Sequence, residues 1–208
     1  MSVNAKRNGT LVGGLLIMLC VGILYMWSIF QPYVVEYHGW SVGDVAMTSA
    51  LMIACFVVGN ILGGLVQSKL DPRAITLVGC LMFSVGIYLT SCLGNAEPWM
   101  LYLTYSVCSG LGCGFAYCTV LYALQKWFDK NGLITGITVF FFGASVMVLS
   151  PVVNKMLENM GLTETFRILA IVFGIITVIC SFFVVQPDPS YYMEKASKVL
   201  RPDEFKQF

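Results

Sequence analysis

The chain has 208 residues, of which 58% are hydrophobic and only 11% are charged, and its mean hydropathy is +0.80. This composition is too apolar for a water-soluble domain and is typical of a protein whose solvent is the lipid bilayer. The formal net charge of +1 excludes a general basic field of the kind that attracts nucleic acid.

Six stretches of the chain lack Asp, Glu, Lys, Arg and His, and each is long enough to cross the hydrocarbon core as a helix. They predict spans at about residues 10–34, 45–68, 74–95, 99–125, 132–154 and 168–186. The first stretch is too long for the apolar region of a cleaved signal peptide, so we interpret it as a retained span. The predicted fold is all-α and integral to the membrane. It has an N-terminal tail at 1–8, a six-helix membrane domain at 9–186 and a C-terminal tail or linker at 187–208.

The positive residues distinguish the two sides of this domain. Ten of the twelve Lys and Arg residues lie in the two tails and in the connections after the second and fourth spans. The other three connections contain only Lys155 and Arg167. Because positive residues resist translocation, we expect a multi-pass protein of the plasma membrane with both termini in the cytoplasm.

The sequence offers little catalytic chemistry. All eight cysteines fall in apolar stretches, where a small buried hydrophobe is the expected role rather than a disulfide or a metal ligand. The single histidine, His38, lies in an external connection and is expected to be a solvated loop residue. We therefore predict that the chain is not an enzyme and binds no metal or cofactor.

The predicted spans also lack the ionisable residues that transporters use as proton relays and counter-charges. The groups left to line a cavity are hydroxyls and the uncharged polar or aromatic side chains Tyr25, Gln31, Asn60, Tyr117 and Tyr122. Such groups shape and orient a ligand but do not neutralise its charge.

Three segments carry a family resemblance. The first is Tyr25-Met26-Trp27-Ser28-Ile29-Phe30 with Gly39-Trp40-Ser41, and the second runs from Gly63 and Gly64 through Lys69 and Asp71-Pro72 to Arg73. The third is Gly110-x-Gly112-x-Gly114 with Tyr117, followed by Lys126-Trp127-Phe128, Gly132, Gly136, Gly143 and Pro151. Together they resemble the oxalate:formate antiporter branch of the major facilitator superfamily, which is close to the monocarboxylate transporters.

This resemblance implies one half of a transporter, built as two inverted three-helix repeats. The implied substrate cavity is lined by Tyr25, Tyr117 and Phe142. A conformational motif is implied at Gly63, Gly64, Lys69, Asp71, Arg73, Gly110, Gly112, Gly114, Lys126, Gly132 and Gly136, in which the glycines let helices approach closely. The chain departs from the family pattern at Ser68, Asp71 and Asn131, where the family has Asp, Gly and Arg.

The function implied by the resemblance is alternating-access transport of a small organic anion, a monocarboxylate or a dicarboxylate. The carboxylate-binding cations would then lie in a second six-helix half, supplied by a separate chain, by a second copy or by further sequence. A self-sufficient homodimeric carrier and a non-transporting membrane scaffold or assembly protein are the alternatives. The expected partners are the lipid bilayer and this second half, with no nucleic acid.

Overall fold

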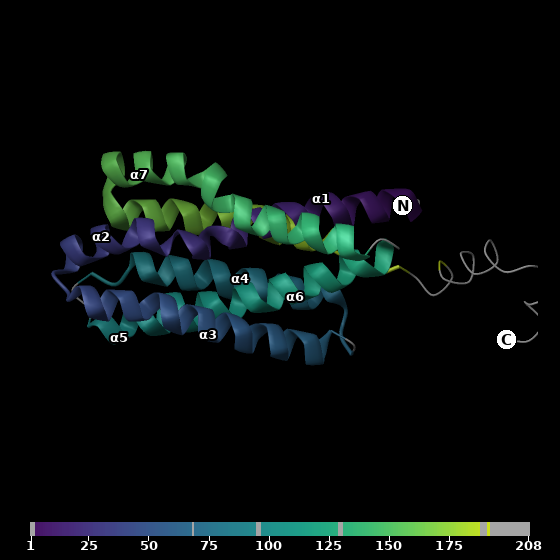
Figure 1. Cartoon of the computed structure of the whole chain (residues 1–208), viewed down its shortest axis with the longest axis horizontal. Helices are drawn as coiled ribbons and strands as arrows, with labels where there is room; N and C mark the ends of the chain where they lie inside the picture. Colours follow the sequence, from purple (N-terminus) through teal and green to yellow (C-terminus); the bar gives the residue numbers. More distant parts are fainter. Residues whose placement is uncertain (1–2, 68, 95–96, 129–130, 188–190, 192–208) are drawn as a thin grey trace, which may run out of the picture.

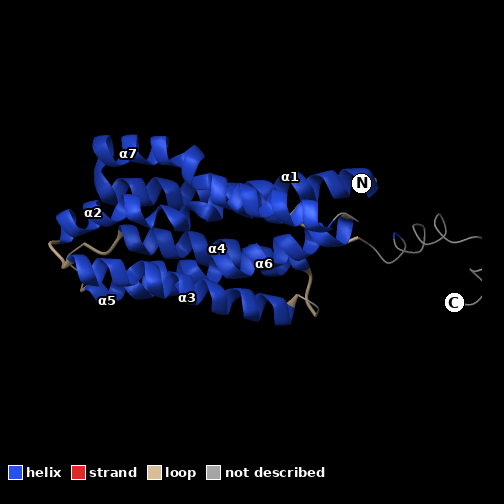
Figure 2. Cartoon of the chain, viewed as in Figure 1, coloured by secondary structure: helices blue, strands red, loops and turns tan. Residues whose placement is uncertain are grey.

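The computed structural model describes residues 3–67, 69–94, 97–128, 131–187 and 191, and every regular element in these ranges is helical (Figure 2). Figure 1 shows the helices running roughly parallel or antiparallel to one long axis. This arrangement satisfies the backbone polar groups of each span within its own helix, as a bilayer requires.

The first span is longer than its apolar stretch. It consists of α1 (Val3–Val21), a short 3-10 segment η1 (Gly22–Met26) and α2 (Trp27–His38). Lys6 and Arg7 therefore lie on the first turns of α1. The span ends at Gly39, whose φ of 67° lets its N–H donate to the carbonyl of Val35 at 2.9 Å.

The next two spans have side-chain caps at their N-termini. α3 (Val42–Val66) begins after Ser41, whose hydroxyl accepts a hydrogen bond from the N–H of Asp44 at 3.1 Å. α4 (Pro72–Ser91) begins after Asp71, whose carboxylate accepts from the N–H of Arg73 at 3.0 Å. The departure from the family pattern at Asp71 thus has a local role as a helix cap.

The fourth span changes its helical pitch along its length. It begins with α5 (Pro98–Leu101), continues as the π-helical η2 (Tyr102–Ser109) and ends as α6 (Gly110–Trp127). The wider π turn directs the hydroxyl of Ser106 to the carbonyl of Thr48 at 2.8 Å and that of Ser109 to the carbonyl of Phe83 at 3.3 Å. The fourth span is therefore bonded to both the second and the third.

The fifth and sixth spans are two limbs of one long element, α7 (Asn131–Ser181), which contains Pro151 and has a non-helical residue at Gly161. Gly161 adopts φ 77° and ψ −179°, and Figure 1 shows the chain reversing so that the two limbs lie antiparallel. At about 1.5 Å per residue, a straight helix of 51 residues would be roughly twice as long as a bilayer is thick. The five helices that are long and apolar enough to cross a membrane thus provide six crossings.

This arrangement differs from the expected connection at 155–167. Both limbs continue through that region and leave Gly161 as the turn, so Lys155 and Arg167 lie on helices. Arg167 pairs with Glu164 at 2.7 Å, one turn earlier on the same limb. A charged segment next to a span can remain helical in water, so the loss of hydrophobicity does not mark the helix end.

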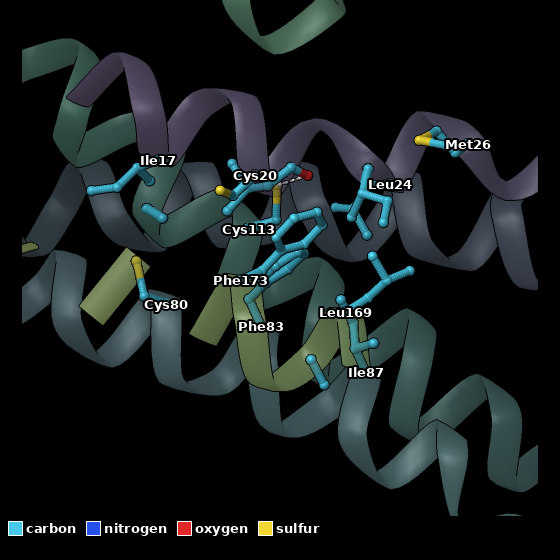
Figure 3. Packing of buried hydrophobic residues seen from close by; sticks show 14 of the residues in the cluster. Ile17, Cys20, Leu24, Met26, Cys80, Phe83, Ile87, Cys113, Leu169 and Phe173 are labelled. Atoms are coloured by element: carbon cyan, nitrogen blue, oxygen red, sulfur yellow. Dashed lines mark hydrogen bonds between the residues drawn. The ribbon is translucent and has the colours of Figure 1, made fainter. Parts of the chain in front are cut away.

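A shared apolar core lies between the first, third, fourth and sixth spans. Figure 3 shows Cys20, Cys80, Phe83, Cys113 and Phe173 meeting there from four different helices. Four cysteines are buried and all of the described cysteines are free thiols, while Cys92, at the end of α4, is exposed. The interpretation of cysteines as small buried hydrophobes therefore fits the core but not Cys92.

The N-terminus and the exit from the sixth span lie at the same end of the bundle. The hydroxyl of Thr10 donates to the carbonyl of Phe183 at 2.9 Å, and the indole N–H of Trp127 donates to the carbonyl of Val185 at 2.6 Å. These bonds satisfy carbonyls that the end of α7 leaves without helical partners. They join the first, fourth and sixth spans at the end of the bundle near the N-terminus (Figure 1).

Candidate substrate cavity

An aromatic cluster brings together the three residues expected to line a cavity. The ring of Phe142, on the first limb of α7, lies 5.1 Å from the ring of Tyr25 in η1 and 5.0 Å from that of Tyr117 in α6. Phe56 of α3 adds a fourth ring, 5.4 Å from Tyr117 and 5.9 Å from Phe142. The first, second, fourth and fifth spans therefore meet at Phe142.

Beside this cluster lies a cavity of about 220 Å³ that is open on one side. Its lining comes from η1, α3 and the first limb of α7, and consists of Leu24, Tyr25, Met52, Ile53, Phe56, Val57 and Phe142. None of these residues carries a charge. Phe142 is buried, whereas Tyr25 and Ile53 are about half exposed at the open side.

Close backbone contact between the first and fifth spans sets the position of Tyr25 against Phe142. Gly22, at the start of η1, faces the carbonyl of Phe142 and the side chain of Ser145 so closely that a Cβ would overlap both. The hydroxyl of Ser145 donates to that same carbonyl at 2.9 Å. Glycine at position 22 thus allows the two aromatic residues to meet.

A second glycine contact positions Phe56 beside Tyr117. Gly114 of α6 packs on the backbone of α3, where a Cβ would overlap the carbonyl oxygen of Phe56 and lie 2.7 Å from the nitrogen of Asn60. Gly59 makes the reciprocal approach, with a built Cβ 2.6 Å from the carbonyl oxygen of Leu111. Gly110 and Gly63 face the same interface, and Gly112 packs on α4 at Gly79 and Phe83.

The glycines of the fifth span do not make the close helix contacts that the conformational motif implies. Apart from the adjacent backbone of its own helix, no atom lies within 4 Å of a Cβ built at Gly132, Gly136 or Gly143. Only 22% of the residues in the most apolar stretches of α3 and α7 are buried, whereas half or more of those in the other three long helices are buried. The predicted close contact of the fourth and fifth spans is thus absent at these described glycines, which are exposed.

The remaining uncharged polar candidates are not members of the aromatic cluster. The side-chain amide of Asn60 donates to the carbonyl of Phe56 at 2.9 Å within its own helix. Gln31 lines a separate open cavity near Glu36, and Tyr122 lies 5.1 Å beneath the ammonium of Lys126. Of the five candidates, only Tyr25 and Tyr117 belong to the cluster.

The predicted conformational motif lies partly at the end of the bundle near the N-terminus. Lys69 and Arg73 are exposed around the α3–α4 connection, and Gly64 is half-buried. Lys126 is exposed at the end of α6. Ser68 and the side chain of Asn131 lie outside the described residues.

His38 at the other end of the first span is not the solvated residue that we expected. Its imidazole stacks on Trp40 with a ring separation of 4.0 Å and borders a small cavity shared with the α4–α5 connection and the second limb of α7. Burial lowers the pKa of His38, although a hydrogen bond with the backbone of Gly94 opposes this shift. The stack with Trp40 covers one face of the imidazole.

Sequence reasoning did not identify Phe56 as part of the cluster. Phe56, Gly59, Asn60 and Gly63 follow the i, i+3, i+4, i+7 spacing of one helix face. The glycines on that face were the signal that Phe56 also points toward the fourth span.

Comparison with known proteins gives a consistent picture. The Major Facilitator Superfamily model matches residues 10–205. The chain is 27% identical over 172 residues to "Uncharacterized MFS-type transporter YhjX" of Escherichia coli (strain K12), which covers 79% of this chain and 42% of that protein. It is 25% identical over 174 residues to the oxalate:formate antiporter of Oxalobacter formigenes, covering 83% of this chain and 41% of that protein.

A shorter match reaches monocarboxylate transporter 10 of Homo sapiens, which is 33% identical over 100 residues, 48% of this chain and 19% of that protein. The chain thus spans less than half the length of these relatives. Since the family model covers nearly all of the sequence, and the structure has the helices of one six-helix half, the chain belongs to the Major Facilitator Superfamily.

Proposed function

We propose that this chain is the N-terminal half of a secondary carrier that moves a small organic anion across a membrane by alternating access. Family membership supports transport as the general activity. The observation that carries the proposal is the cluster of Tyr25, Tyr117 and Phe142, since it places aromatic groups from three spans beside a cavity. Cavities of this kind, between helices of a bundle, are common ligand sites.

We propose that the substrate contains a carboxylate. Two relatives are named for carboxylate substrates, the oxalate:formate antiporter and monocarboxylate transporter 10. The cavity itself has an apolar lining with the phenol of Tyr25 as its polar group. A phenol hydroxyl can donate a hydrogen bond to a carboxylate but cannot neutralise it. The counter-charge is therefore proposed to come from a second six-helix half.

The proposed binding surface for that half is the exposed apolar face of α3 and the first limb of α7. The open glycines at 132, 136 and 143 lie on this limb, and glycines allow another helix to approach closely. The relatives are more than twice as long as the segment that they share with this chain, which supports a partner of similar size.

The proposed topology places both termini in the cytoplasm and the chain in the plasma membrane. Cys92 provides a test, because it is the exposed cysteine at the opposite end of the bundle from Thr10. A membrane-impermeant maleimide should label Cys92 in intact cells, and Cys92→Ser should abolish this labelling. Labelling that requires permeabilised cells would reverse the orientation.

Transport is tested in proteoliposomes with radiolabelled formate, pyruvate, lactate and oxalate. One preparation holds the 208-residue chain alone. A second holds the chain together with the part of the oxalate:formate antiporter that follows the matched segment. We expect saturable uptake only in the second preparation, and we expect Tyr25→Ala and Tyr117→Ala to reduce it.

Saturable uptake by the chain alone would overturn the proposed half and establish a self-assembling carrier. Failure of uptake in both preparations, with the helical circular dichroism of each intact, would contradict transport and favour a membrane scaffold. Empty liposomes and Tyr88→Ala, a variant of an exposed tyrosine on α4 that lies outside both the cavity and the proposed binding surface, serve as controls.

A further inference from the structure

The wall of the cavity has a chemical character that bears on substrate choice. Ile53, Phe56 and Phe142 present aliphatic and aromatic carbon to the cavity, and Phe56 and Phe142 lie nearly parallel, at 14°. The polar group of the lining, the phenol of Tyr25, belongs to a residue that is 53% exposed. The buried lining residues, Leu24, Met52 and Phe142, are therefore apolar, and Tyr25 is the polar residue among the exposed ones.

The size of the cavity suits an apolar group of several carbons. Apolar cavities of about 150 Å³ remain dry and hold a benzene molecule. The cavity here has a volume of about 220 Å³ and a similarly apolar lining, and it is open on one side. Formate has no apolar group to place against this wall, whereas a branched or ring-bearing carboxylate does.

A second carboxylate would be unfavourable at the same wall. A carboxylate placed against the buried residues Leu24, Met52 and Phe142 would lose its hydration without meeting a cation, because no lining residue is charged. One carboxylate at the open side, next to Tyr25, avoids this cost.

We infer that the cavity receives the apolar tail of a monocarboxylate, with its carboxylate at the open side near Tyr25, and that the wall rejects dicarboxylates such as oxalate. This inference rests on the proposed function, because it assumes that the cavity is part of the substrate site. It narrows the substrate from a small organic anion to a monocarboxylate with an aliphatic or aromatic tail. Tail recognition is assigned to this half and charge recognition to its partner.

Binding to the chain alone separates these two contributions. The chain is placed in lipid nanodiscs and titrated with phenylacetate, its uncharged amide phenylacetamide, formate and oxalate, with binding followed by saturation-transfer NMR. We expect phenylacetamide to bind at least as tightly as phenylacetate, because this half recognises the tail. Formate and oxalate should bind at least about 100-fold more weakly than phenylacetamide, since one lacks the tail and the other places a charge on the wall.

Two matched pairs of variants locate the site. Ile53→Ala removes part of the wall, whereas Ile61→Ala removes the same atoms from a similarly exposed position of α3 that does not line the cavity. Phe142→Ala and Phe140→Ala form the corresponding pair on α7. We expect about fivefold weaker phenylacetamide binding for Ile53→Ala, a larger loss for Phe142→Ala, and no change for either control.

The pair at positions 53 and 61 keeps the test decisive if Phe142→Ala, in the buried core, does not fold. Oxalate binding as tight as that of phenylacetamide would overturn the inference. So would equal losses in Ile53→Ala and Ile61→Ala, and so would a lack of phenylacetamide binding, as expected if a lipid acyl chain fills the cavity.

Failure of the inference is distinguishable from failure of the proposed function. Uptake of oxalate in preference to phenylacetate by the two-component proteoliposomes would support transport and contradict selection for an apolar tail. Binding of phenylacetamide that depends on Ile53, with no uptake of any carboxylate, would leave the apolar site standing and contradict transport.

Discussion

Replacing Gly114 by alanine tests whether backbone contact between α3 and α6 holds the cavity together. A Cβ at this position would lie 2.7 Å from the nitrogen of Asn60 and 2.8 Å from the carbonyl carbon of Gly59, and would overlap the carbonyl oxygen of Phe56. These are backbone atoms, so no rotamer change removes the overlap. Because unstrained carbon contacts lie at about 3.5–4.0 Å, the two helices must separate by roughly 1 Å.

Such overpacking costs about 1–3 kcal/mol in well-packed proteins. Since the separation loosens several glycine contacts of the same interface, we expect about 2 kcal/mol and a fall in Tm of about 4–8 °C. The assay is thermal unfolding of the purified chain in one detergent, followed by far-ultraviolet circular dichroism. Ligand binding in the cavity should weaken in parallel, because Phe56 lies on the displaced helix.

Gly136→Ala is the matched control. Nothing lies within 4 Å of a Cβ built at Gly136, and alanine is the better helix former, so Tm should remain equal or rise. Equal falls in the two variants would show that loss of glycine, rather than backbone contact, is responsible. An unchanged Tm in Gly114→Ala would refute the close approach of α3 and α6.

Two further predictions concern the ends of the bundle. Trp127→Phe removes the buried hydrogen bond to Val185 and should destabilise the chain by about 1–2 kcal/mol, measured as a lower Tm, whereas Trp99→Phe, at an exposed ring, should change it little. His38 has a pKa below its usual 6.5 in the folded chain because burial disfavours the imidazolium. The unfolded chain therefore binds the proton first, so the contribution of His38 is complete above about pH 6.5 and is lost as pH falls toward the folded-state pKa. His38→Phe should flatten the decrease in Tm between about pH 8 and pH 5, and an unchanged pH dependence would contradict this role.

The number of crossings could be predicted from the sequence because the bilayer excludes charge from each span. The helix ends could not, because helices continue into water wherever the backbone permits. Lys155 and Arg167 suggested a connection, yet both lie on helical limbs that meet at Gly161. A turn made by a single glycine at φ 77° does not change the local composition, whereas a loop rich in proline or asparagine does.

The aromatic cluster was predicted through the family resemblance, which named Tyr25, Tyr117 and Phe142. Hydropathy alone does not identify them, because an aromatic residue in an apolar span has the same hydropathy whether it faces lipid, the core or a cavity. The spacing of glycines likewise predicted close approach but not the partner. Gly59 and Gly114 meet each other's helices, while Gly136 faces outward, and this difference depends on how the spans pack.

The glycine contacts also indicate where the proposed carrier would move. Gly22 joins the first span to the fifth, and Gly114 joins the fourth to the second, each through direct contact with backbone. Both contacts connect one three-helix repeat to the other, and a backbone in contact with a backbone leaves little room for sliding. We therefore expect the six helices to move as one body. The motion of alternating access would then take place at the outer faces of α3 and the first limb of α7, where Gly132 and Gly136 face away from the rest of the bundle and a second half would pack.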